Sequence, residues 1–191
     1  ITEEAPIKPA ESAYGSTKQM CETILKDYTN VYHKNTIILR YFNPIGAHPS
    51  ALIGELPLGV PNNLIPYITQ TAAGIRKELL VFGNDYDTPD GTCIRDYIDV
   101  MDLAKAHVKA LARLLEHKNT QSPEYYNLGT GKGSSVLDII KTFEDVNHLK
   151  VNYRFAPRRD GDITQAYADA SLAREKLGWV AEVPLSETLK N

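Results

Sequence analysis

The chain has 191 residues, with 21 basic and 24 acidic side chains, a net charge of −3 and 42% hydrophobic residues. The mixed charges form no basic stripe for nucleic acid, and no apolar run approaches the ~20 residues of a membrane span. We therefore expect a folded, cytoplasmic protein without nucleic-acid or membrane partners, in which Cys21 and Cys93 are reduced thiols.

The first predicted element is a helix over residues 14–28. One set of its side chains recurs at helical spacings of three and four: Tyr14, Lys18, Cys21, Leu25 and Tyr28. Ser12 is suited to cap this helix at its start. The β-branched and aromatic run 36–42 predicts a strand buried on both faces, as in a parallel sheet. Frequent proline and glycine predict a structured loop over 45–66.

Strands and helices alternate through the rest of the chain. We expect helices over residues 67–73, 101–117, 136–149 and 171–177, and strands over 79–82, 93–100, 125–128 and 151–155. This alternation is typical of an α/β fold with a largely parallel sheet.

Tyr14 and Lys18 are the first candidates for chemistry. On a helix they lie on one face, about 6 Å apart along the axis. A free phenol is protonated at neutral pH, but a neighbouring ammonium favours the phenolate, which can take a proton from a hydroxyl and return it. The alternative is an exposed pair without a chemical role. Asn43 follows the predicted strand where ligands of α/β sheets bind, or it only ends that strand before Pro44.

Longer motifs resemble those of the UDP-glucose 4-epimerase family. They are residues Pro9–Lys18, Arg40–Ala47, Gly59–Leu64, Val81–Tyr86, Asp90–Tyr97, Tyr126–Gly131, Arg158–Asp162 and Tyr167–Asp169. These motifs stand in the family's order and cover nearly the whole chain. The Tyr-x-x-x-Lys spacing alone marks only the extended short-chain dehydrogenase/reductase superfamily.

The resemblance implies both a fold and a reaction. Residues 1–45 and 97–128 would form a partial Rossmann-type parallel sheet for NAD, and 46–96 and 129–191 a smaller α/β domain for the UDP-sugar. The implied reaction, part of galactose metabolism, interconverts UDP-glucose and UDP-galactose. It oxidises C4 to a 4-keto intermediate, which rotates and is reduced on its other face. A homodimer is implied as well.

Specific roles follow from the same resemblance. Tyr14 would be the catalytic base, Lys18 would support it and bind the nicotinamide ribose, and Phe42 would lie beside the nicotinamide. The other implied site residues bind the UDP-sugar: Asn43, Asn63 and Leu64 at the sugar and diphosphate, Leu80 and Phe82 at the uracil, Arg95 and Arg159 at the diphosphate, and Asp162 at the uridine ribose. Guanidinium groups suit phosphate because they donate two parallel hydrogen bonds.

Two of these assignments have plainer alternatives. Without the resemblance, Arg95 beside Asp96 reads as a surface ion pair, and Arg159 as a charge on a solvated loop. Ala166 stands where family members differ in side-chain size. Its small side chain predicts room for an N-acetyl group, and so tolerance of UDP-N-acetylhexosamines.

The sequence departs from the family at its beginning. It contains no glycine-rich dinucleotide loop, because Gly129–Gly133 does not meet that spacing. The serine or threonine that accompanies the Tyr/Lys pair is also absent. We therefore expect the carboxyl-terminal portion of a longer enzyme, which alone would be inactive and bind NAD weakly or not at all.

Alternative functions remain open at this point. One is a related UDP-sugar dehydratase, decarboxylase or uronate epimerase, and another is a nucleotide-sugar-binding fragment without catalysis. A metal site is not expected, because the histidines form neither HxH nor HExxH spacings: His33, His48, His107, His117 and His148.

Overall fold

Parallel strand pairs form the framework of the computed structural model, which describes residues 1–190. The parallel pairs are β1 (Ile37–Tyr41) with β6 (Glu124–Leu128), β2 (Asn43–Ile45) with β5 (Tyr97–Asp99), β3 (Leu79–Phe82) with β8 (Tyr153–Ala156), and β4 (Ile94–Arg95) with β9 (Gln165–Ala166). β7 (Ser134–Ser135) pairs with β4 in the antiparallel sense. The predicted α/β fold with parallel sheets is confirmed.

Six helices accompany these strands within residues 1–190. They are α1 (Ala13–Tyr32), α2 (Leu64–Ala72), α3 (Val100–Leu115), α4 (Val136–Asn147), α5 (Ser171–Leu177) and α6 (Leu185–Thr188). The predicted N-cap is confirmed, since Ser12 Oγ accepts a hydrogen bond from Gly15 N at 3.0 Å. The second helix begins at Leu64, three residues earlier than predicted. None of these helices combines the length and the apolar character needed to cross a bilayer.

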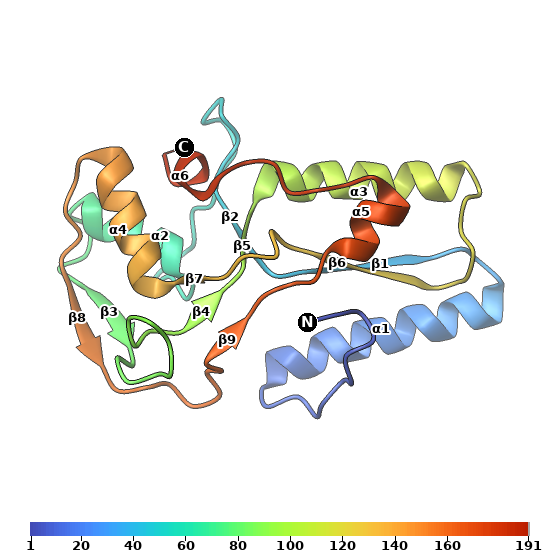
Figure 1. The fold of residues 1–191 in the computed structure, drawn as a ribbon, viewed down its shortest axis with the longest axis horizontal. Coiled ribbons are helices and arrows are strands. Elements are labelled where there is room, and N and C mark those ends of the chain that lie inside the picture. The colour runs from blue at the N-terminus through green and yellow to red at the C-terminus, as the bar shows by residue number, and fades with distance from the viewer. Residues whose placement is uncertain (191) are drawn as a thin grey trace.

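The elements form two groups, each with its own hydrophobic core (Figure 1). One core lies among β3, α2, α4 and α6: Ile45, Ile68, Leu79, Val81, Ile139, Ile140, Phe143, Val151 and Leu189. The other lies among β6, α3 and α5: Ile98, Leu103, Ala106, Tyr126, Leu128, Ala173, Leu177 and Trp179. The domain boundaries expected from the sequence stay a prediction. Residues 173–179 nevertheless pack with β6 and α3, although that prediction assigns them to the other domain.

The strands change partners at Phe42 and Asp96. β1 pairs with β6 as far as Tyr41, whereas from Asn43 onward the chain pairs with β5. The predicted strand over 36–42 corresponds to β1, whereas the single strand predicted over 93–100 is wrong, because that run divides into β4 and β5, which have different neighbours. Local β-propensity does not record which partner a strand will have.

A buried carboxylate holds this junction together. Asp96 is fully buried, and it accepts hydrogen bonds from the backbone N–H groups of Thr130, Gly131 and Ala168 at 2.9 to 3.1 Å. The Thr130 hydroxyl donates to it as well, at 2.7 Å. A Cβ at Gly129 would overlap with the Asp96 carboxylate, so the sequence requires glycine there. Asp96 thus accepts hydrogen bonds from backbone N–H groups that have no carbonyl partner on a neighbouring strand.

Replacing Asp96 tests the importance of this junction. We expect Asp96→Ala to lower the free energy of unfolding by about 3 to 5 kcal/mol, because it leaves several buried donors without an acceptor. Urea denaturation measures this change. Asp145→Ala, at an exposed carboxylate on α4, is the control and should change stability by less than about 0.5 kcal/mol. Equal effects of the two variants would contradict this view of Asp96.

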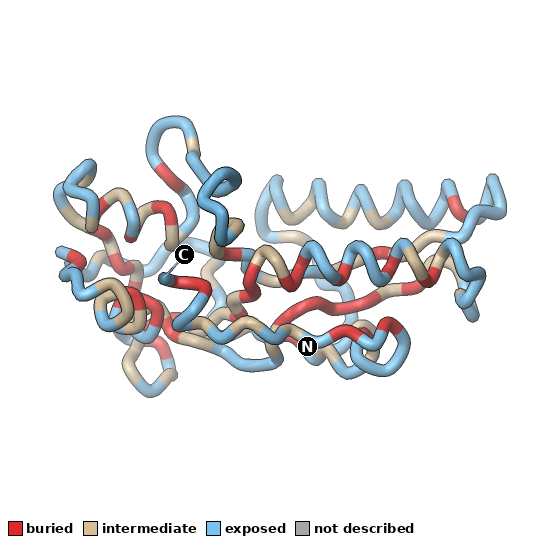
Figure 2. Tube along the Cα trace, turned by 90° about the horizontal axis from the view of Figure 1, so that it is seen from above, coloured by how far each residue is buried: buried red, intermediate tan, exposed pale blue. Residues whose placement is uncertain are grey.

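Helix α1 is held beside the β1–β6 pair mainly by polar contacts. Only Thr29 of this helix is buried, and Figure 2 shows α1 exposed along nearly its whole length. The Thr29 hydroxyl donates to Thr36 Oγ1 at 2.7 Å. Arg40 of β1 binds both carboxylate oxygens of Glu22, at 2.7 and 2.6 Å. A bidentate pair of this kind fixes direction as well as distance, so it sets how α1 lies against the sheet.

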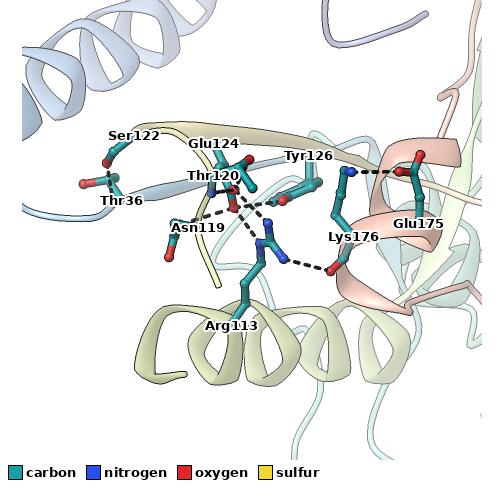
Figure 3. Close-up of polar contacts among 9 residues, drawn as sticks. All are labelled: Thr36, Arg113, Asn119, Thr120, Ser122, Glu124, Tyr126, Glu175 and Lys176. Atoms are coloured by element: carbon teal, nitrogen blue, oxygen red, sulfur yellow. Dashed lines mark hydrogen bonds and ion pairs between the residues drawn. The ribbon is translucent and has the colours of Figure 1, made fainter. Parts of the chain in front are cut away.

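A buried ion pair connects α3, β6 and α5 (Figure 3). Arg113 of α3 donates to both oxygens of Glu124 at 2.7 and 2.8 Å, and to the Lys176 carbonyl of α5 at 3.3 Å. Glu124 also accepts from Thr120 N and the Tyr126 hydroxyl. Burial opposes the charged form of Glu124, but these hydrogen bonds outweigh it and lower the pKa of the carboxyl to about 2.

This shift predicts a loss of stability in acid. The folded-state pKa of Glu124 lies below its usual 4.5, so its contribution is complete above that pH and disappears as the pH falls toward about 2. We expect wild type to exceed Glu124→Gln in free energy of unfolding by roughly 2 to 3 kcal/mol at pH 7. Urea denaturation at several pH values should show this difference shrink below pH 4.5. A difference independent of pH would contradict the assignment.

Candidate active site

One large cleft, of about 1250 Å³, is lined by residues of α1, of strands β1 to β5 and of the start of α2. Every site residue predicted from the sequence lines this cleft except Ala166: Tyr14, Lys18, Phe42, Asn43, Asn63, Leu64, Leu80, Phe82, Arg95, Arg159 and Asp162. Their positions span most of the chain. The fold therefore brings together residues that no short motif connects.

Tyr14 and Lys18 lie in the first turns of α1, on the side that faces the cleft. The Lys18 ammonium is 5.0 Å from the centre of the Tyr14 ring. Both side chains are exposed, and 71% of Tyr14 is accessible. The ammonium therefore lies over the aromatic ring, and the phenol and the ammonium both border the cleft.

Arg95 and Arg159 also line the cleft, and they meet at Asp162. Arg159 Nε lies 3.0 Å from Asp162 Oδ2, and Arg95 Nη2 lies 3.8 Å from Asp162 Oδ1. The Arg159 guanidinium also lies over the Phe82 ring, 4.8 Å from its centre. Two guanidinium groups share one carboxylate, so a net positive charge faces the cleft. Such an arrangement suits a diphosphate.

The plainer reading of Arg95 as the surface partner of Asp96 is wrong. Asp96 is buried among backbone donors, and the ion-pair partner of Arg95 is Asp162. Adjacent residues of an extended chain point to opposite sides. Asp96 therefore points into the strand junction while Arg95 faces the cleft. The Arg95 side chain is also partly buried, with 17% of it exposed, which a solvated surface charge would not be.

The remaining predicted residues border the cleft at three places. Phe42 and Asn43 occupy the point where the strands change partners. Leu80 and Phe82 belong to β3. Asn63 precedes α2, and its side chain donates to Glu55 Oε1 at 3.2 Å rather than capping the helix. The first backbone N–H groups of α2 thus receive no side-chain cap from Asn63, and they open next to the cleft.

Ala166 is the exception among the predicted residues. It lies on β9, directly beside Arg95 in the strand register, and its carbonyl accepts from Asp96 N at 3.1 Å. It does not line the cleft. The prediction that its small size admits an N-acetyl group stays a prediction.

Cys93 and Tyr97 also line the cleft, although neither was predicted as a site residue. Burial raises the pKa of both side chains, so both stay neutral near pH 7. A signal for them was available. Residues 93, 95 and 97 share one face of an extended chain, so the assignment of Arg95 to the site extends to both neighbours. Cys21 and Cys93 are free thiols in the structure.

Comparison with known proteins places this geometry in a family. Residues 1–191 match the family described as GDP-mannose 4,6 dehydratase. The chain belongs to this family. Among curated relatives, it is 51% identical to the UDP-glucose 4-epimerase of Haemophilus influenzae, over 100% of this chain and 56% of the relative. It is 53% identical to the Bacillus subtilis UDP-glucose 4-epimerase, over 98% of this chain and 54% of that protein.

Solved structures agree with these relatives. UDP-glucose 4-epimerase of Stenotrophomonas maltophila, with bound NAD and formylated UDP-arabinopyranose, superposes with a TM-score of 0.92 at 48% identity. The Bifidobacterium longum enzyme, in complex with NAD+ and UDP, gives 0.91 at 47%. Each match covers 100% of this chain and 56% of the solved chain. The resemblance to UDP-glucose 4-epimerases is thereby confirmed. The chain spans about half the length of these relatives.

Proposed function

We propose that the protein carrying this chain interconverts UDP-glucose and UDP-galactose by NAD-dependent inversion at C4. The chain would supply the proton-transfer pair and most of the UDP-sugar site. The observation that carries this proposal is the meeting, in one cleft, of Tyr14 and Lys18 with Arg95 and Arg159. Relatives about half identical to the chain bear the name of this activity.

The proposed mechanism assigns proton transfer and diphosphate binding to different residues of the cleft. Tyr14 takes the proton of the sugar 4-hydroxyl and later returns it, and Lys18 stabilises the charge that this leaves on the phenol. Arg95 and Arg159 hold the diphosphate, away from the reacting carbon. Because the two arginines bind the diphosphate and not the hexose, the 4-keto sugar is free to turn and present its other face. Binding energy remote from the reacting centre thus serves the reaction.

The residues present fit one end of the dinucleotide. Tyr14, Lys18 and Phe42 place a hydroxyl, an ammonium and an aromatic ring on the same cleft, which suits a nicotinamide nucleoside. When bound, NAD supplies the acceptor and donor of the C4 hydride. The glycine-rich loop for the dinucleotide phosphates is not in this sequence. We therefore propose that this chain by itself binds NAD weakly and does not turn over substrate.

A related UDP-sugar dehydratase is the second candidate, since the family that matches the chain is named for a dehydratase. Proton transfer and the diphosphate grip would serve that reaction too. Product analysis with UDP-galactose separates the two, because only the epimerase yields UDP-glucose. The homodimer and the cytoplasmic location stay predictions.

The first prediction for this function concerns the proton-transfer pair. In the full-length protein, Tyr14→Phe should lower kcat for UDP-galactose by about 10² to 10⁴, because it removes the proton acceptor, while KM changes little. Lys18→Met should act in the same direction. Tyr28→Phe, at another exposed tyrosine of α1, is the matched control and should retain full activity. Equal rates for Tyr14→Phe and Tyr28→Phe would contradict the proposed role of Tyr14.

The second prediction concerns the binding of the diphosphate by Arg95 and Arg159. Arg95→Gln should weaken UDP binding by about ten- to a hundredfold, as expected for the loss of a charged hydrogen-bond donor. Isothermal titration calorimetry with UDP measures this. Arg174→Gln, at an exposed arginine of α5 away from the cleft, should bind UDP like wild type. An Arg95→Gln protein with unchanged UDP affinity would place the diphosphate elsewhere.

A further inference from the structure

Arg158 directly precedes the cleft residue Arg159 in sequence, but its side chain lies in a separate socket formed by Asp85 and Tyr86. Its guanidinium lies over the Tyr86 ring, 4.0 Å from the ring centre. Its Nε donates to Asp85 Oδ1 at 2.7 Å, and its Nη2 donates to the Asp85 carbonyl. Arg158 does not line the large cleft, whereas Arg159 does. The two neighbouring arginines therefore contact different parts of the protein.

The socket is built from the turn that follows β3. Tyr86 is only 4% exposed, and its N–H donates to the Gly91 carbonyl at 3.0 Å, which closes the turn. Gly83 has a φ of +80°, and a Cβ there would overlap with the Tyr86 ring and press on the Arg158 side chain. The turn thus leaves space for Arg158 where an ordinary residue would fill it.

This socket fixes the chain just before it enters the cleft. β8 pairs with β3 as far as Ala156, after which the chain leaves the sheet. Arg158 is attached to the β3 turn, and the next residue, Arg159, reaches the Phe82 ring and Asp162. Asp162 N also donates to the Arg159 carbonyl at 3.3 Å. Arg158 is thus attached to the β3 turn directly before the chain enters the cleft at Arg159.

We propose that Arg158 is a positioning residue for UDP binding: its attachment to Tyr86 and Asp85 holds Arg159 and Asp162 in place. The inference rests on the proposed function for the identity of the ligand. Arg158 touches neither the cleft nor the reacting carbon. Its loss should therefore weaken binding and leave the chemical step intact.

The test compares two arginines of the same segment in the full-length protein. Arg158→Met removes the ion pair and the stacking contact, and UDP affinity by calorimetry should fall about tenfold, equivalent to about 1.4 kcal/mol. The kcat at saturating UDP-galactose should stay within about twofold of wild type. Arg154→Met is the control. Arg154 pairs with Glu78 across the same strands at 2.8 Å, but it lies before the loop, so its loss should leave UDP affinity unchanged.

Two further variants keep the test decisive if Arg158→Met proves unstable. Asp85→Asn keeps Arg158 on the Tyr86 ring but removes an exposed partner charge, and should weaken UDP binding about threefold. Arg158→Lys keeps the charge and should restore most of the affinity. Wild-type UDP affinity in Arg158→Met, or equal losses in the two methionine variants, would overturn the inference. A protein whose UDP affinity falls in Arg158→Met but which does not epimerise UDP-galactose would instead overturn the proposed function alone.

Discussion

The Asp96 carboxylate accepts hydrogen bonds from three backbone N–H groups at the place where the strands exchange partners. Where two strands diverge, backbone N–H groups lose their partners, and a buried N–H group without an acceptor lowers the stability of the fold. Because Asp96 supplies the acceptors, the strands can separate inside the protein. Phe42, Asn43 and Arg95 stand at this separation and face the cleft. The geometry of the site therefore depends on a residue that does not contact the cleft.

The two groups of side chains to which we assign proton transfer and diphosphate binding belong to parts of the chain that are held independently. Tyr14 and Lys18 belong to α1, which the Arg40–Glu22 pair attaches to β1. Arg159 belongs to the loop after β8. The groups that we propose for proton transfer and for anion binding thus have separate supports. This division suits the proposed reaction, in which the diphosphate stays fixed while the hexose turns.

Local patterns predicted much of this structure. Helical spacing and a serine cap located α1, and alternation of elements indicated the α/β class. The meeting of Arg95 with Arg159 could be expected only from the family resemblance, because no local rule relates residues so distant in sequence. Because local patterns do not relate distant residues, the division of residues 93–100 and the burial of Asp96 were also not predicted. Nothing local divides residues 93–100 into two strands, and the buried role of Asp96 depends on donors from residues 130–168. Propensity describes a segment, whereas burial and pairing depend on the whole fold.

A crystal structure of the full-length protein with UDP would show where the diphosphate binds. We expect diphosphate oxygens within about 2.7 to 3.2 Å of the guanidinium groups of both Arg95 and Arg159. The end of the diphosphate that carries the sugar should point toward Tyr14. Diphosphate density away from both arginines, or a Tyr14 hydroxyl turned out of the cleft that holds UDP, would contradict this expectation.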